Sequence, residues 1–258
     1  MNARNIFRLL AAALIAAASI ITMKNSSQTV YNNYYAVSAG KKLPIYCVET
    51  SGGARRQAAI TFNAAWGAEG MDEILRILAE RAARATFFLC GYWIEQFPEE
   101  ARRIRDAGHD IANHGDTHAH VAKLSLEQNL HEILDAHAKA KNLLGVEMNL
   151  FRPPFGEYNN TVLEAAEAAG YYAIQWDVDS HDWMNKGVDY EINQVLNHKH
   201  LGSGSIILFH CGARDTPAAL PLILDGLAEK GYEFVTVSEL IHTQNFYMDH
   251  EGRQRLNK

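Results

Sequence analysis

The chain alternates short apolar runs with longer amphipathic segments from residue 56 to residue 241. The short runs have the length and composition of strands, whereas the longer segments repeat apolar residues at helical spacing. Strand followed by helix, repeated along the chain, predicts a parallel sheet covered by helices, and about seven such units favour a barrel over an open sheet. We therefore predict an α/β fold of the (β/α) barrel type for this region.

Local signals support the individual elements. Pro98 and the two acids after it open one predicted helix, and Ser125 with Gln128 has the pattern of a capping box at the start of another. The predicted strands and helices are listed here in chain order: strands over 58–62, 86–90, 109–112, 150–152, 172–178, 205–209 and 233–237, and helices over 71–83, 98–107, 125–145, 160–169, 188–196 and 217–230.

Composition limits the possible partners. The 258 residues suffice for one large α/β domain, and a net charge of -6 provides no basic surplus for binding nucleic acid or an anionic membrane surface. The three cysteines, Cys47, Cys90 and Cys211, are widely spaced and odd in number, so we predict neither a disulfide framework nor a C-x-x-C zinc site. Cys90 lies in an apolar run and is expected in the core.

The N-terminus indicates export. Arg4 and Arg8 precede an apolar run over 9–23, after which the sequence turns polar, as in a signal sequence. The run is shorter than the roughly 20 residues that span a bilayer, yet no convincing cleavage site follows it. We predict that residues 1–24 are a signal peptide or, preferably, an uncleaved membrane anchor, which makes the protein secreted or membrane-anchored outside the cytoplasm. A buried N-terminal helix is the alternative.

Three further segments complete the predicted organisation. Residues 25–55 are polar and Tyr-rich with little periodicity, which is typical of a linker. Residues 56–241 form the predicted domain. Residues 242–258 are a polar, charged C-terminal tail, for which the sequence suggests no function.

Polar side chains follow several of the predicted strands. In a parallel barrel, functional groups gather where the strands end, so these side chains are expected to share one site. His114 and His118 are four residues apart, and on a helical turn both rings would lie on one face and could share a divalent cation. The residues at strand ends are Asn63, His114, Arg152, the segment 177–183 and His210.

Each of these residues also has a purely structural explanation. A histidine pair at this spacing is more often solvated or packed than metal-bound, and a histidine at a strand end is usually a satisfied core residue. Arg152 before two prolines could stiffen a loop, and Trp183 and Leu208 could be core residues. The aspartates of segment 177–183 could be helix caps.

Five segments, taken together and in order, resemble the motifs of polysaccharide deacetylases, the NodB homology domain of carbohydrate esterase family 4. The resemblance covers roughly residues 56–241 and is closest to the sporulation branch of that family. The segments are Thr61-Phe-Asn-Ala-Ala-Trp-Gly67, His114-Gly-Asp-Thr-His118, Arg152-Pro-Pro-Phe-Gly156, Asp179-Ser-His-Asp-Trp183 and Leu208-Phe-His210.

The resemblance implies a distorted (β/α)7-type barrel, the NodB homology or glycoside hydrolase/deacetylase fold. It also implies hydrolysis of N-acetyl groups in a glycan polymer such as peptidoglycan or chitin, with one divalent metal ion, commonly zinc or cobalt. His114 and His118 match the two histidine ligands of that metal. His210 matches the general acid that protonates the departing amine, and Asp182 matches its orienting partner.

The same resemblance suggests roles for four more residues. Trp183 and Leu208 match the apolar pocket for the acetyl methyl group. Phe155 would offer its backbone N–H to the developing oxyanion. Arg152 matches the arginine that holds the catalytic aspartate.

The first motif departs from the family, whose usual form is Thr-Phe-Asp-Asp-Gly. Asn63 stands in place of the general base, and Ala64 stands in place of the third metal ligand, a loss that is typical of the sporulation branch. Asn63 can orient a water molecule but cannot take its proton, so we expect the rate to be lower by roughly 10²- to 10⁴-fold. Arg152 also lacks its anionic partner.

Several functions therefore remain open. The leading hypothesis is an impaired deacetylase in which Asp116 or Asp179 serves as a substitute base. The alternatives are a degenerate, glycan-binding protein of the spore or cell envelope and a purely structural envelope protein. A glycosidase would need two carboxylates roughly 5 to 9 Å apart, which Asp179 and Asp182 could supply, but the histidine pair would then have no role. The sequence has no phosphate-binding loop, serine nucleophile elbow or dinucleotide fingerprint.

Overall fold

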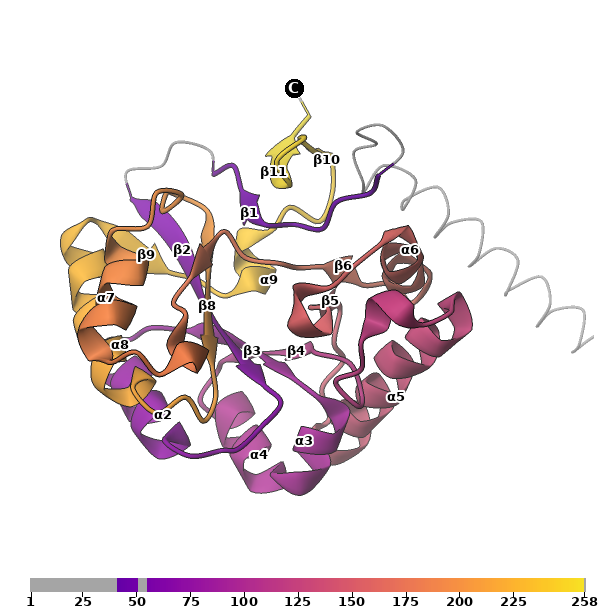
Figure 1. Ribbon diagram of the computed structural model, residues 1–258, viewed down its shortest axis with the longest axis horizontal. Coiled ribbons are helices and arrows are strands. Elements are labelled where there is room, and N and C mark those ends of the chain that lie inside the picture. Colours follow the sequence, from indigo (N-terminus) through magenta and orange to yellow (C-terminus); the bar gives the residue numbers. More distant parts are fainter. Residues whose placement is uncertain (1–40, 51–54, 258) are drawn as a thin grey trace, which may run out of the picture.

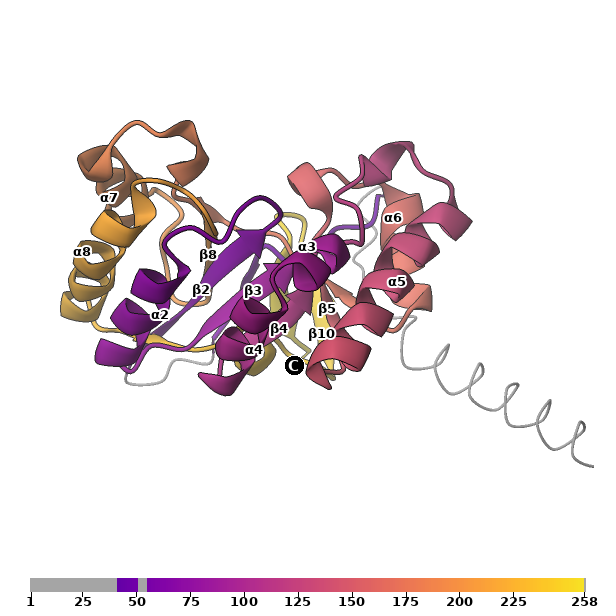
Figure 2. The ribbon, with the colours of Figure 1, turned by 90° about the horizontal axis from the view of Figure 1, so that it is seen from below.

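The computed structural model describes residues 41–50 and 55–257. A curled sheet lies at the centre, and the helices surround it (Figure 1). In the perpendicular view, α2, α7 and α8 lie at one end of the sheet and α5 and α6 at the other (Figure 2). The prediction of an α/β fold built on a curled, largely parallel sheet is confirmed.

The strands pair in the order β10-β11-β1-β8-β2-β3-β4-β5-β6, with β7 on β8 and β9 on β2. The register between β2 and β8 is parallel and sets Asn63 directly beside His210. The strands are β1 (Cys47–Val48), β2 (Arg56–Ala64), β3 (Ala85–Leu89), β4 (Asp110–Asn113), β5 (Leu150–Phe151), β6 (Tyr172–Ala173), β7 (Val178–Asp179), β8 (Ser205–His210), β9 (Tyr232–Phe234), β10 (Phe246–Met248) and β11 (Arg253–Leu256).

All six predicted helices are present, with small shifts at their ends. The Ser125 capping box of α5 is formed, and Gly145 ends that helix in the left-handed conformation. Two short helices, α3 and α9, were not predicted. The helices are α2 (Met71–Glu80), α3 (Gly91–Gln96), α4 (Pro98–Asp106), α5 (Leu126–Leu144), α6 (Asn160–Ala168), α7 (Val188–Leu196), α8 (Thr216–Glu229) and α9 (Val237–Leu240).

The predicted strand over 172–178 is wrong as a single element. Its first part, β6, pairs with β5, whereas its last part, β7, pairs with β8 on the other side of the sheet. Between them, Ile174 forms a parallel bridge with Ile45, and Gln175 N–H donates to the Ile45 carbonyl at 2.7 Å. The segment therefore crosses from one neighbour to another, and no continuous strand can form.

Both ends of the described chain belong to the sheet. The linker predicted over 25–55 is wrong for residues 41–50, since β1 pairs with β8 and with β11. The tail predicted over 242–258 contributes β10 and β11, and Gln254 within it is fully buried. The rest of the predicted linker and the leader over 1–24 lie outside the described residues, apart from Arg55. Within 41–50 and 55–257, no helix combines the length and hydropathy that crossing a bilayer requires.

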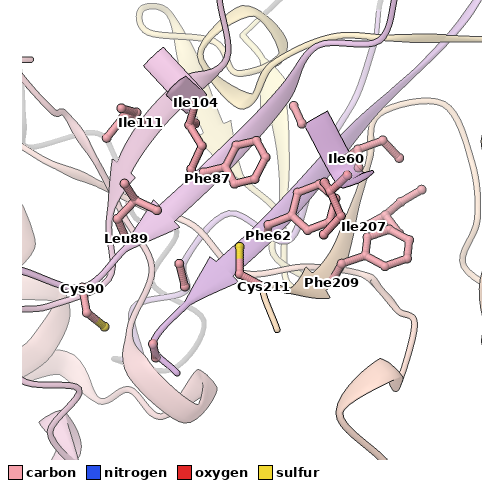
Figure 3. Close-up of a cluster of buried hydrophobic side chains, with 14 of the residues drawn as sticks. Ile60, Phe62, Phe87, Leu89, Cys90, Ile104, Ile111, Ile207, Phe209 and Cys211 are labelled. Atoms are coloured by element: carbon pink, nitrogen blue, oxygen red, sulfur yellow. The ribbon is translucent and has the colours of Figure 1, made fainter. Parts of the chain in front are cut away.

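The core under the strand ends is aromatic (Figure 3). Phe62 of β2 stacks on Phe87 of β3 with ring centroids 4.8 Å apart, and Phe209 of β8 lies 5.5 Å from Phe62. All three are fully buried. Cys90 and Cys211 are buried and unpaired in the same cluster, which confirms the core position expected for Cys90. This rigid layer fixes the ends of β2, β3 and β8.

His109 is a buried histidine that must remain neutral. It precedes β4, is 8% exposed, and its Nδ1 accepts the backbone N–H of Ala85 at 3.2 Å. Burial, with a smaller contribution from the Arg84 charge, lowers the pKa of His109 to about 4. The unfolded chain therefore takes up a proton at higher pH than the folded chain does, and stability falls as pH drops below about 6.5.

We predict that His109→Asn makes stability less dependent on pH between about pH 6.5 and pH 4, because its side-chain oxygen can accept the Ala85 N–H without titrating. The slope should decrease by up to about 1.4 kcal/mol per pH unit. Urea unfolding at several pH values measures this slope. His131→Asn, at an exposed position on α5, is the matched control. Equal slopes in wild type and His109→Asn would contradict the prediction.

Candidate functional site

A cavity of about 400 Å³ opens where β2, β4 and β8 end. It collects seven of the nine residues that the sequence predicted for the site. Arg152 and Asp182 are buried behind its wall. The lining residues are Asn63, Ala65, Trp66, His114, His118, Phe155, Gly156, Trp176, Asp179, Trp183, Leu208 and His210.

His114 and His118 lie together, but no helical turn brings them together. The segment after β4 is a loop in which Gly115 has φ +78° and His118 has φ +57°. Two left-handed residues fold the chain back on itself, so that the ring centroids are 5.1 Å apart. The expected proximity of the two rings is present, and the predicted helical geometry is wrong.

Glu132 of α5 holds this loop in place. Its carboxylate accepts the backbone N–H groups of Asp116 and Thr117, each at 2.9 Å, and the Thr117 hydroxyl at 2.6 Å. The Gly115 carbonyl in turn accepts the Gly91 N–H. Glu132 was not predicted as part of the site, because a glutamate in a helix is usually a solvated residue.

Both imidazoles are suited to bind a cation. His114 is fully buried, and its Nδ1 lies 2.7 Å from the Arg152 carbonyl, so Nδ1 carries the proton and Nε2 keeps its lone pair. Burial, and secondarily the neighbouring histidines, lower the pKa of His114 and of His118. Neutral imidazoles are the form that ligates zinc or cobalt.

A third protein ligand is not evident in the described part of the chain. No group of three or more histidine, cysteine, aspartate or glutamate side chains there is placed to share a metal ion. Ala64, where the resemblance expects a carboxylate, is fully buried. The residues present therefore fit a cation held by two imidazoles, with weaker affinity than a three-ligand site.

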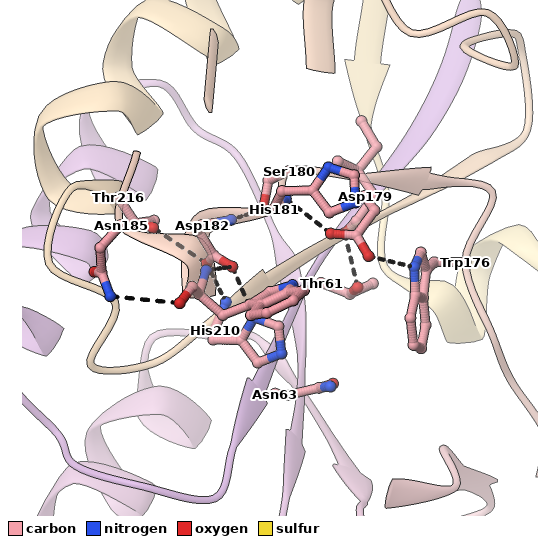
Figure 4. Close-up of polar contacts among 12 residues, drawn as sticks. Thr61, Asn63, Trp176, Asp179, Ser180, His181, Asp182, Asn185, His210 and Thr216 are labelled. Carbon is pink, nitrogen blue, oxygen red and sulfur yellow. Dashed lines mark hydrogen bonds and ion pairs between the residues drawn. The ribbon is translucent and has the colours of Figure 1, made fainter. Parts of the chain in front are cut away.

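His210 and Asp182 form a hydrogen-bonded pair (Figure 4). Asp182 is 2% exposed, and its Oδ1 lies 2.7 Å from His210 Nδ1. The same carboxylate accepts the backbone N–H groups of His210 and Trp183 and the hydroxyl of Thr216. These four contacts fix the carboxylate and the imidazole, so that Nε2 is the nitrogen left for a ligand in the cavity.

Asn63 lines the cavity, and Arg152 lies buried behind it. Arg152 is fully buried, and its Nη1 donates to Asn63 Oδ1 and to Thr61 Oγ1, each at 2.9 Å. Its Nη2 donates to the Gln175 carbonyl, whereas its Nε has no hydrogen-bond partner among the described residues. Burial lowers the pKa of the Arg152 guanidinium, and the Asp179 charge partly offsets this. Because the amide oxygen of Asn63 faces Arg152, its NH₂ group is the part free to meet water.

The two suggested substitute bases differ in position. Asp116 pairs with Lys139 at 2.8 Å and is not among the residues that line the cavity. Asp179 does line the cavity, and its carboxylate accepts the Trp176 indole N–H at 3.1 Å and the His181 backbone N–H at 2.8 Å. Of the two, Asp179 alone can reach a ligand there.

Aromatic side chains surround the mouth of the cavity. Trp66, Phe155 and Trp183 are about half exposed, at 52%, 54% and 49%. Trp66 stacks on the His210 ring at 5.1 Å, and Phe155 packs against His118 at 4.4 Å. Half-exposed aromatic faces can stack on the apolar faces of sugar rings. Trp66 was not predicted as part of the site, although an aromatic residue just after a strand end was a usable indication.

Known proteins resemble this chain in sequence. A family described as polysaccharide deacetylase matches residues 51–174. A peptidoglycan-N-acetylglucosamine deacetylase of Bacillus cereus is 37% identical over 188 residues, which cover 71% of this chain and 87% of that protein.

Solved structures resemble it as well. A wild-type carbohydrate esterase family 4 pseudoenzyme from Bacillus anthracis superposes with a TM-score of 0.72 at 28% identity, covering 83% of this chain and 73% of that one. A mutant of the same pseudoenzyme, described as having restored enzymatic activity, gives the same TM-score and identity and covers 78% and 71%.

We predict that Glu132→Gln loosens the histidine loop, because an uncharged amide oxygen accepts more weakly than a carboxylate and cannot accept on both sides. Amide hydrogen exchange at Asp116 and Thr117 should become faster, while exchange in β2 and β3 stays unchanged. Hydrogen exchange followed by NMR measures this. Glu127→Gln, at an exposed position of α5, serves as control. Unchanged protection of both amides would show that Glu132 does not hold the loop.

Proposed function

Because the chain belongs to the polysaccharide deacetylase family, we propose that it is an impaired deacetylase of an N-acetylated cell-wall glycan. The substrate class is peptidoglycan or a related polymer of N-acetylglucosamine. The observation that carries this proposal is the meeting of the His114 and His118 pair with the His210–Asp182 pair in one cavity. The first pair would hold a cation that polarises the acetamide carbonyl, and the second pair would supply the acid that amide hydrolysis needs.

His210 is the proposed general acid. Asp182 holds Nδ1 at 2.7 Å, which directs the other ring nitrogen to the ligand. A protonated imidazole there can donate to the departing amine as the acetamide C–N bond breaks. Trp66, stacked on the same ring, restricts its motion and limits the access of water.

His114 and His118 would hold a divalent cation, with zinc or cobalt as the favoured ions. When bound, such an ion polarises the acetamide carbonyl and acidifies water. The fit is supported by two neutral imidazoles, one of them oriented by the Arg152 carbonyl. Leu208, 2% exposed, and Trp183 form an apolar wall that suits the acetyl methyl group, and the Phe155 N–H is the proposed oxyanion donor.

The weak step is removal of a proton from the attacking water. The side-chain oxygen of Asn63 accepts a hydrogen bond from Arg152, which leaves the NH₂ group on the cavity side. This group can orient a water molecule but cannot take its proton. Asp179 is the proposed substitute base, since its carboxylate lines the same cavity. Loss of a positioned base lowers the rate by roughly 10²- to 10⁴-fold.

A second candidate function is glycan binding without turnover. It is supported by Asn63 in the place of the base and by the similarity to a protein described as a pseudoenzyme. In that case the half-exposed aromatic residues would hold glycan in the spore or cell envelope. Export, a membrane anchor over 1–24 and a link to sporulation are parts of the same proposal, and they rest on the leader sequence and the resemblance.

We predict that Asn63→Asp increases acetate release from N-acetylated peptidoglycan or chitin oligosaccharides by roughly 10²-fold or more, because it restores a base next to Arg152. Acetate is measured with the full chain and added zinc or cobalt. Asn185→Asp, outside the cavity lining, is the matched control. Measurable release by wild type supports the impaired enzyme, whereas release by Asn63→Asp alone supports the glycan-binding alternative. If neither protein releases acetate, the result would count against the impaired deacetylase and against the catalytic role of position 63.

We also predict that the metal-free protein binds zinc or cobalt with one-to-one stoichiometry and that His114→Ala abolishes this binding. Isothermal titration calorimetry measures binding without any assay of activity. His120→Ala, which removes an exposed imidazole close to the pair, should leave binding intact. If His114→Ala binds the ion as wild type does, the proposed metal site is wrong.

A further inference from the structure

Trp176 lines the cavity, and the proposed mechanism gives it no role. It lies in the segment that crosses from β6 to β7, three residues before Asp179. Its indole N–H donates to Asp179 Oδ2 at 3.1 Å (Figure 4). Because Asp179 is the proposed substitute base, the groups that hold its carboxylate decide whether it can meet a water molecule in the cavity.

Two donors fix the Asp179 carboxylate, one on each oxygen. The His181 backbone N–H donates to Oδ1 at 2.8 Å, which is the contact of an Asx turn. The Trp176 indole donates to Oδ2. The backbone at Asp179 is fixed as well, because this residue pairs with Leu208 in the parallel register of β7 and β8. Of the two donors, the indole is the one that belongs to a side chain, so substitution can remove it.

The loop that carries Phe155 holds the indole ring in place. A Cβ atom at Gly156 would lie 2.9 Å from Trp176 Cη2, so the ring packs directly on the backbone of that loop. The side-chain amide of Gln175, next to Trp176, donates to the Gly156 carbonyl at 3.1 Å and ties the two segments together. A ring packed this closely has little freedom to turn its N–H away from Asp179.

The buried guanidinium of Arg152 lies over the same ring. Arg152 Cζ is 5.5 Å from the centroid of the Trp176 ring, a distance at which the cation is attracted by the π electrons. A cation there polarises the indole and makes its N–H a stronger donor to a carboxylate. Burial lowers the pKa of Arg152, and the Asp179 charge raises it. Trp176 therefore contacts both the buried cation and the carboxylate that partly compensates it.

We propose that Trp176 is a positioning residue for Asp179. An ionised carboxylate can accept about four hydrogen bonds, so the two donors fix the group and leave sites that can accept one from water. In the proposed reaction, one proton passes from water to Asp179 as the water oxygen bonds to the acetyl carbon. This catalytic consequence rests on the proposed function, whereas the contact between indole and carboxylate does not.

The first test follows the four tryptophan indole N–H signals by NMR in the full, metal-free, ¹⁵N-labelled chain. Trp176→Phe assigns the Trp176 signal. We expect this signal to shift as the pH is lowered and Asp179 takes up a proton, and we expect Asp179→Asn to abolish the shift. The other titratable side chains of the cavity remain in that variant. Trp93, whose indole N–H donates to the Gly67 carbonyl at 3.1 Å, is the internal control and should not shift.

The second test compares acetate release in two backgrounds. Trp176→Phe keeps an aromatic ring and removes the N–H, so it should lower acetate release by wild type about 10-fold. In Asn63→Asp, where position 63 supplies the base, the same change should lower release roughly threefold or less. Loss of a sugar contact or of packing would lower release equally in both backgrounds, which separates these explanations from the positioning of Asp179.

Two results would overturn the proposal. One is a Trp176 signal that responds to pH in the same way in wild type and in Asp179→Asn. The other is an equal loss of acetate release from Trp176→Phe in the two backgrounds. Unchanged signals of the remaining indoles would verify that the variants fold. If wild type releases no acetate, the impaired deacetylase fails as a function, and the NMR titration still decides whether the indole holds the carboxylate.

Discussion

One buried guanidinium connects the elements that carry the site. Arg152 donates to Thr61 and Asn63 of β2 and to the Gln175 carbonyl, and its own carbonyl orients His114. A fully buried charge is stable only when surrounding groups compensate it, and here amide and hydroxyl oxygens do so where a carboxylate would do more. The hydrogen bond from Arg152 to Asn63 thus links the segment after β5 to β2 and also limits what the residue at position 63 can do chemically.

The parts of the fold that could be predicted are those with local causes. The alternation of apolar runs and helical periods, together with caps such as Ser125, gave β2, β3, β8 and the six longer helices. The segments 172–178, 41–50 and 242–257 were interpreted wrongly or left uninterpreted, because their strands are two to four residues long and most of them pair with strands far away in the sequence. A two-residue strand such as β1 has no periodicity to detect.

The site residues likewise divide into those that could be predicted from the sequence and those that could not. Motif order identified the residues that meet in the cavity, since the ends of parallel strands share one edge of the sheet. Spacing alone suggested a helical turn for His114 and His118, and the left-handed residues that form the actual loop have no comparable sequence pattern. Glu132 was missed because a glutamate in a helix is usually a solvated residue.

The bridge between Ile45 and Ile174 has a consequence for the order in which the chain folds. Ile45 and Cys47 are synthesised early, yet their partners lie at Ile174 and Ser205, far along the chain. Contacts of such long sequence separation form late and slowly. Until then an apolar edge stays open, which is a hazard for a polypeptide that is still emerging from the ribosome. A segment that is made early is therefore among the last to find its place.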